Sequence, residues 1–252
     1  MNIMIVKRVI PIKKIIIKTL KIICSVSIII CTLYLITGIS EEEENEKVYE
    51  EMQEIHKKEE EQITENEEEN KEKSFEHWLE IPDTNINYPV IQGKDNSFYL
   101  NHDYYGNYHP YGCLFLNYKT NENSVNNVIY GHNVNLAYNR PIFAMLIDYK
   151  KKNFREEHQY IYFDNEKYQL VAVIRFNAKN LSKWNYMQRE FTEEEFKEYI
   201  KGMKEYAAYY NEEITLKNEP KNILTLSTCD RLLDYGPYGR NGRLLVIAQK
   251  IQ

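Results

Sequence analysis

A lone cysteine at the end of a short apolar run is the first feature of this chain that could do chemistry. The stretch NILTLSTCDR places Cys229 beside an aspartate and after alternating apolar and polar residues. In a strand over residues 222–229, Thr225, Ser227 and Cys229 would share the polar face. A structural cysteine more naturally lies among apolar neighbours, as Cys113 does in YGCLFL. The pattern favours a nucleophile at Cys229, with inert core filler as the alternative.

A cysteine nucleophile needs a basic or cationic helper, because a thiol is mostly protonated near neutral pH. The chain has six histidines. His132 stands out, because NNVIYGHN places it just after a predicted strand and a glycine, where a side chain can project into a cleft. A turn histidine without a chemical role is the competing interpretation. The others lie in charged or aromatic segments: His56, His77, His102, His109 and His158.

Three short motifs, in the order histidine, cysteine, arginine, carry a resemblance to a known family. They are YGHN at residues 130–133, TLSTC at 225–229 and GRLLVIA at 242–248. Together with IPDTNINYPVIQGKDNSFYLNHD and a long helical segment ahead of the cysteine, they resemble the sortases, and the class B branch in particular. Each motif alone is weak, whereas the combination is specific. The likeness covers about residues 74–252.

The resemblance implies a cysteine transpeptidase tethered outside a Gram-positive cell. It implies that Cys229 is the nucleophile, that His132 is a general acid and base, and that Arg243 stabilises the oxyanion. The implied substrate is a surface protein with a C-terminal sorting signal of Asn-Pro-x-Thr-x type. This signal would be cleaved after Thr through a thioacyl intermediate, and the protein would be transferred to a cell-wall peptidoglycan amine. Further candidates for substrate binding are Ser227, Thr228 and Tyr130.

Several alternatives stay open beside this interpretation. Arg231 and Arg240 lie in the long loop DRLLDYGPYGRNG and compete with Arg243, which is favoured because it directly precedes an apolar strand. The alternative functions are pilin polymerisation, hydrolysis with water as acceptor, and a non-catalytic membrane-tethered binding module with the same fold. We expect no cofactor, and no metal site, since the sequence shows no His, Cys and Asp residues at ligand spacing.

The elements that must position these residues are mainly β. Short runs rich in β-branched and aromatic residues predict strands: NINYPVI, GCLFLNY, NNVIYGH, QYIYFD, KYQLVAVIRF, NILTLST and RLLVIAQKI. Residues 141–149 and a longer segment from Thr192 look helical, and Thr192 with Glu195 forms a capping box. Along the longer segment, apolar residues recur at helical spacing from Phe196 to Tyr210. The resemblance implies a closed sortase-type β-barrel of about eight strands, with an N-terminal helical region and this one long inserted helix.

The first 73 residues are segregated by charge and hydropathy. Residues 22–39, IICSVSIIICTLYLITGI, carry no charge and are long enough for a transmembrane anchor. A cleaved signal peptide and a buried core helix are the alternatives. Basic residues before this span and acids after it predict that residues 1–21 are cytoplasmic and the rest extracellular. Residues 40–73 are predicted to be a solvated acidic stalk, with an interaction tail as the alternative, and residues 74–252 the catalytic domain.

Charge and cysteine usage limit the possible partners. The formal net charge is −6, and the acids concentrate in the predicted stalk, so the domain has no basic excess and nucleic acid is not an expected partner. Of the four cysteines, Cys24 and Cys31 lie in the predicted span. Cys113 and Cys229 lie outside it, and we expect both to be free thiols.

Overall fold

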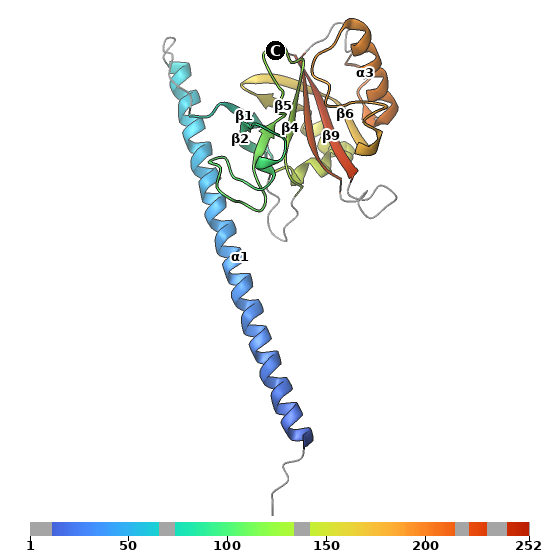
Figure 1. Cartoon of the computed structure of the whole chain (residues 1–252). Coiled ribbons are helices and arrows are strands. Elements are labelled where there is room, and N and C mark those ends of the chain that lie inside the picture. Colours follow the sequence, from blue (N-terminus) through green and yellow to red (C-terminus); the bar gives the residue numbers. More distant parts are fainter. Residues whose placement is uncertain (1–11, 66–73, 134–141, 215–221, 231–240, 252) are drawn as a thin grey trace, which may run out of the picture. The chain divides into compact units, whose positions relative to one another are not determined.

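The computed structural model describes residues 12–65, 74–133, 142–214, 222–230 and 241–251 (Figure 1). By its contacts the chain divides into two compact units, Met1–Glu51 and Met52–Gln252. The described helical elements are α1 (Ile12–Glu65), η1 (Phe98–Leu100), η2 (Ala144–Lys150), α2 (Lys152–Glu157), η3 (Ala178–Asn180) and α3 (Glu193–Tyr206). The described strands are β1 (His77–Glu80), β2 (Asn87–Gln92), β3 (Leu114–Leu116), β4 (Asn126–Tyr130), β5 (Tyr160–Phe163), β6 (Glu166–Asn177), β7 (Ala207–Tyr210), β8 (Ile223–Cys229) and β9 (Gly242–Lys250).

The second unit is a closed β-barrel. The strands follow the order β5-β1-β2-β3-β4-β8-β9-β6-β7, and an additional pairing between β5 and β6 closes the barrel (Figure 1). Eight strands therefore form the ring, and β7 adds to the outside of β6. The predicted barrel of about eight strands is confirmed, and so is the N-terminal helix.

Apolar side chains cover both faces of the long strands. One face fills the barrel, where Leu224 and Leu226 are fully buried. The other face packs under α3 and the segment before it, in a cluster that includes Phe176, Trp184 and Phe196. Both faces are therefore buried along most of β6, β8 and β9, and the buried polar side chains of β8 lie among these apolar residues. The site at the ends of these strands is thus built on a rigid base.

The structure differs from the sequence prediction at three elements. Strand β1 was not among the predicted strands. The predicted helix from Thr192 has its capping box, but α3 ends at Tyr206, and β7 follows at once because it pairs with β6. A helix was expected over residues 141–149, and among the described residues the structure has the 3-10 helix η2 there instead. In each case a tertiary pairing or contact overrides the local pattern.

The first unit contains the candidate membrane span. Within the part of α1 whose side chains the structure describes, Ile15–Leu33 is 19 residues long, with a mean hydropathy of 2.1 and none of its hydrophobic window buried. This stretch overlaps the span expected at residues 22–39 and begins earlier. Its length and composition suit a membrane anchor, and a signal sequence near the N-terminus would meet the same criteria.

The C-terminal part of α1 belongs to the barrel unit. Met52 is only 2% exposed, and the side-chain amide of Gln53 donates to the Asn87 carbonyl at 2.8 Å. The ring of His56 stacks on Trp78 with 4.0 Å between centroids. Residues 52–56 of the predicted stalk therefore pack on the domain, and the compact unit includes them.

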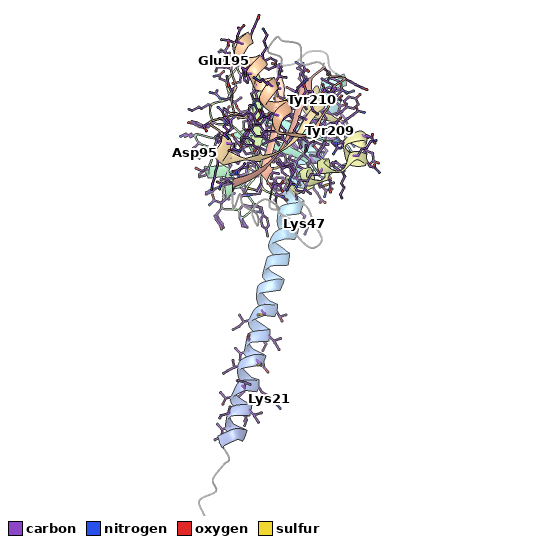
Figure 2. All side chains as sticks on the ribbon, turned by 90° about the vertical axis from the view of Figure 1, so that its right-hand side faces the viewer. Lys21, Lys47, Asp95, Glu195, Tyr209 and Tyr210 are labelled. Atoms are coloured by element: carbon purple, nitrogen blue, oxygen red, sulfur yellow. The ribbon has the colours of Figure 1, made fainter. Side chains whose placement is uncertain are left out.

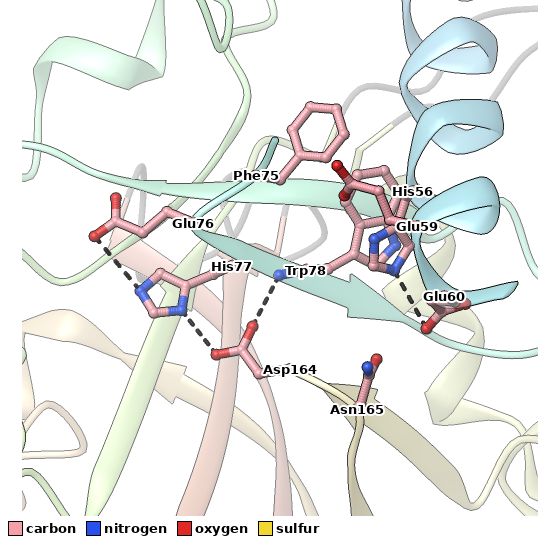
Figure 3. Close-up of a pocket in the computed structure, with 9 residues that line it drawn as sticks. All are labelled: His56, Glu59, Glu60, Phe75, Glu76, His77, Trp78, Asp164 and Asn165. Atoms are coloured by element: carbon pink, nitrogen blue, oxygen red, sulfur yellow. Dashed lines mark hydrogen bonds and ion pairs between the residues drawn. The ribbon is translucent and has the colours of Figure 1, made fainter. Parts of the chain in front are cut away.

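A small pocket lies beside this helix end (Figure 3). His77 contacts Asp164 there, with 2.7 Å between Nδ1 and Oδ2, and His56 lies 3.5 Å from the Glu60 carboxylate. The pocket contains none of the residues expected to be catalytic. Its side chains join α1 to β1 and to the β5–β6 turn, which is a structural role.

Candidate active site

The ends of three neighbouring strands bring the predicted catalytic residues together. Strands β4 and β8 run parallel, with Tyr130 opposite Ser227. Two residues beyond this pair in the sequence are His132, which follows β4, and Cys229, which ends β8. Both residues therefore lie at the same edge of the sheet. Strand β9 runs antiparallel on the other side of β8 and places Arg243 opposite Cys229. Histidine, cysteine and arginine thus follow one another across the sheet edge.

Hydrogen bonds join the His132 turn to the cysteine strand. The Thr228 hydroxyl donates to the Gly131 carbonyl at 2.7 Å, and the Asn133 side-chain amide donates to the Cys229 carbonyl at 3.0 Å. Gly131 is required here, since a Cβ at this position would lie 2.5 Å from the Leu114 side chain. Within the YGHN motif, Gly131 therefore allows the close packing against Leu114, and Gly131 and Asn133 form hydrogen bonds with β8.

The two cysteines of the barrel unit differ in accessibility. Both are free thiols, as expected, but Cys113 is 2% exposed whereas Cys229 is half-buried. Burial raises the pKa of Cys113 far above its usual range, with a smaller contribution from Asp103, so this thiol is inert. Cys229 is the accessible one, at the open end of β8.

Tyr186 joins Arg243 to the cysteine strand, and sequence reasoning did not find it. Its hydroxyl lies 3.4 Å from the Ser227 hydroxyl, and the side chain is 3% exposed. Burial raises the pKa of Tyr186, while hydrogen bonds with Ser227 and Arg243 oppose that rise. The Tyr186 hydroxyl therefore interacts with both Ser227 and Arg243. Its position in a long connection between β6 and α3 gives no signal in the sequence.

Asp230, directly after Cys229, is a buried carboxylate that sequence reasoning also passed over. It is 0% exposed and accepts from two cations, Lys150 Nζ at 2.9 Å and Arg175 Nε at 2.7 Å. Burial lowers the pKa of Lys150, and the contact with Asp230 opposes this. A buried charge persists only when it is paired, so this cluster ties the end of β8 to β6 and η2.

The remaining candidates have contacts inside the protein. Thr228 is 2% exposed and its hydroxyl is bonded to Gly131, so it braces the site. The Tyr130 hydroxyl accepts from the Asn117 amide at 2.9 Å, and burial raises the pKa of that phenol. Arg231 and Arg240, the rival arginines, lie outside the described residues.

The arrangement suits acyl transfer through a covalent intermediate. A half-exposed thiol, an imidazole and a guanidinium from separate strands can attack a carbonyl, move a proton and stabilise the resulting oxyanion. Among the described residues no group of three or more His, Cys, Asp or Glu side chains could hold a metal ion.

Comparisons with known proteins agree with this geometry. The family model described as the sortase domain matches residues 79–251. Sortase B of Staphylococcus aureus is 31% identical over 180 residues, which are 69% of this chain and 68% of that protein. Sortase B of Listeria monocytogenes is 33% identical over 173 residues, which are 67% of this chain and 66% of that protein.

Solved structures give the same result for the fold. The Staphylococcus aureus sortase B–substrate complex superposes with a TM-score of 0.67 at 25% identity, covering 84% of this chain and 98% of that one. Sortase B of Clostridium perfringens gives a TM-score of 0.60 at 31% identity, covering 70% of this chain and 93% of that one.

Proposed function

This chain belongs to the sortase family, as a sortase B-type transpeptidase, and from that premise we propose its substrate, mechanism and location. It cleaves a C-terminal sorting signal of Asn-Pro-x-Thr-x type after Thr and transfers the protein to a cell-wall peptidoglycan amine. The observation that carries this proposal is the strand register, which brings His132, Cys229 and Arg243 to one edge of the sheet.

Cys229 and Arg243 perform the first half of the reaction. The sulfur attacks the carbonyl carbon of the signal threonine and gives a tetrahedral oxyanion. Arg243 donates hydrogen bonds to that oxygen, and its fixed positive charge also favours the thiolate. The C–N bond then breaks, and a thioacyl intermediate remains on Cys229. The Tyr186 contact supports this role, because it restrains a side chain that is otherwise long and flexible.

His132 moves the proton in both halves. As general acid it protonates the departing amine, and as general base it takes a proton from the incoming amine. The bond between Asn133 and the Cys229 carbonyl supports this pairing, because it keeps the histidine turn at the cysteine.

The sorting signal lies along the open edge beside Cys229 in this proposal. A solved structure with 25% identity is described as a Staphylococcus aureus sortase B–substrate complex, which supports substrate binding by this fold. Tyr130 faces the region of Tyr186 and Arg243, and we assign it to the wall that positions the substrate, whereas Ser227 is 3% exposed and supports this wall through its hydrogen bond to Tyr186.

The N-terminal helix is the membrane anchor in this proposal. Ile15–Leu33 is long and apolar enough to cross a bilayer. The basic residues before it place the N-terminus in the cytoplasm, so the barrel works outside the cell.

The test uses the full chain in detergent with a peptide that contains Asn-Pro-x-Thr-x. Cleavage is followed by mass spectrometry, with and without a glycine-peptide or diaminopimelate-type amine. We expect cleavage after Thr and, when amine is present, a product in which the threonine carboxyl is joined to it. A control peptide with the Pro and Thr exchanged should stay intact. Equal cleavage of both peptides, or of neither, would contradict the proposed specificity.

A further inference from the structure

The catalytic histidine has a hydrogen-bond partner that fixes which of its nitrogens carries the proton. His132 Nε2 lies 2.8 Å from the Leu100 backbone oxygen, in the β2–β3 loop. A carbonyl oxygen has no proton to give, so Nε2 must be the donor. A neutral imidazole carries one proton, and Nδ1 is therefore the nitrogen left with a free lone pair.

The loop that presents this carbonyl is itself well held. Asp95, at the surface of the domain, accepts from the Ser97 hydroxyl and backbone amide, both at 2.7 Å, and from the Phe98 amide at 2.8 Å (Figure 2). These bonds lower the pKa of Asp95, the Ser97 hydroxyl having the largest effect. The His102 ring stacks on Phe98 with 3.8 Å between centroids. The 3-10 turn that ends in Leu100 is thus fixed at its start and on its outer side.

Gly112 supports the turn from the other side. It has φ of +58°, and a Cβ there would lie 2.1 Å from the Tyr99 oxygen and 2.8 Å from the Leu100 carbonyl carbon and oxygen. Backbone atoms cannot give way as the end of a flexible side chain can. Gly112 is thus the residue that lets the chain return directly behind the carbonyl that His132 uses.

We propose that the Leu100 carbonyl is a positioning group for His132, which makes Nδ1 the atom that exchanges protons with both amines. This inference rests on the proposed function. Nδ1–H of the imidazolium protonates the departing amine as the C–N bond breaks, and the ring becomes neutral with Nε2–H retained. The incoming amine then attacks the thioester carbon and gives a proton to Nδ1, while the C–S bond breaks and Cys229 leaves as the thiolate.

The first test reads the tautomer directly, by nitrogen-15 NMR of the full chain with labelled histidine. The spectrum of His132→Gln identifies the signals of His132 among those of the six histidines. At a pH where the ring is neutral, we expect a protonated Nε2 and an unprotonated Nδ1. The opposite tautomer, or a rapid mixture of the two, would overturn the inference and leave the proposed function standing. The expected tautomer with full activity in His132→Gln would instead overturn the role of His132.

The second test uses two glycines of the same loop as a matched pair. Gly112→Ala drives a methyl group against the Tyr99 oxygen and the adjoining Leu100 carbonyl, whereas Gly106, with φ of +83°, has nothing within 4 Å of an added Cβ. Both variants strain a left-handed residue, so only the displacement of the carbonyl differs.

We expect Gly112→Ala to lower turnover at least about tenfold, with a smaller change in KM and a mixture of His132 tautomers. Gly106→Ala should stay within about twofold of the parent chain. Equal turnover in both variants, or loss in Gly112→Ala with an unchanged His132 spectrum, would contradict the proposal. Tryptophan fluorescence checks that both variants fold, and if Gly112→Ala does not fold, the tautomer of the parent chain decides.

Discussion

Replacing Asp230 with asparagine tests whether the buried ion cluster holds the end of β8, which carries Cys229. The change keeps the shape of the side chain and removes its charge, so Lys150 and Arg175 lose their common anionic partner. Removing one partner of a buried ion pair costs about 3–5 kcal/mol. Asp230 is fully buried, and we therefore start from this range.

Partial exposure of the Lys150 and Arg175 side chains reduces the expected cost of losing the ion pair. The Lys150 side chain is 21% exposed and that of Arg175 is 38% exposed, so water can solvate both once the carboxylate is gone. The asparagine oxygen can still accept one hydrogen bond. We expect a loss of about 2 kcal/mol in the free energy of unfolding. For a domain of this size that lowers Tm by about 4–8 °C.

Thermal unfolding of the full chain, followed by tryptophan fluorescence, measures this shift. Trp78 and Trp184 are each 5% exposed and report on opposite parts of the barrel unit. Asp83→Asn is the control, because it makes the same chemical change at an exposed turn with a left-handed backbone that asparagine tolerates. A Tm for Asp230→Asn within about 1 °C of the control would refute the claim that the cluster stabilises the site.

Three further predictions concern the oxyanion donor, the helix end and the buried tyrosines. Arg243→Lys should lose on the order of 100-fold in turnover in the peptide assay, because an ammonium lacks the planar fork, while Arg240→Lys stays near normal; the reverse result would transfer the role to Arg240. A chain starting at Ser74 should unfold at lower urea than one that keeps Met52 and the rest of the helix, by about 2–5 kcal/mol, and equal midpoints would show that the helix end adds nothing. Burial raises the pKa of Tyr199 above its usual value of 10.0, so the stability it contributes is present below pH 10 and is lost as the pH rises toward the folded pKa; an unfolding free energy that stays constant above pH 10 would contradict this.

The sequence was sufficient to predict most of the barrel strands, because they are short runs rich in β-branched and aromatic residues bounded by turn residues. The runs around β6, β8 and β9 were identified in this way, and the capping box marked the start of α3. The strands β1 and β7 are four residues long, and pairing with β2 or β6 determines them. The sequence pattern did not mark them, because β1 has a polar or charged residue at each end and β7 continues the apolar spacing of α3.

The candidate site was likewise predicted only in part. The resemblance named His132, Cys229 and Arg243, and the strand register accounts for their proximity. The sequence did not indicate the contacts that hold these residues in place, because the partners are far apart in the chain. Asp230 pairs with a lysine 80 residues away, and His132 bonds to a backbone group 32 residues away. A backbone carbonyl has no signature in a sequence, and a lysine that pairs with a buried carboxylate looks like any surface lysine.

The central claim is that Cys229 forms a covalent acyl intermediate, and intact-mass spectrometry tests it most directly. The full chain is mixed with excess Asn-Pro-x-Thr-x peptide without amine, and acid stops the reaction after seconds. We predict an added mass equal to the peptide fragment that ends in Thr, located on the proteolytic fragment containing Cys229, removed by hydroxylamine and absent in Cys229→Ala. Cleavage of the peptide by Cys229→Ala, or an acyl group on any other residue, would contradict the account.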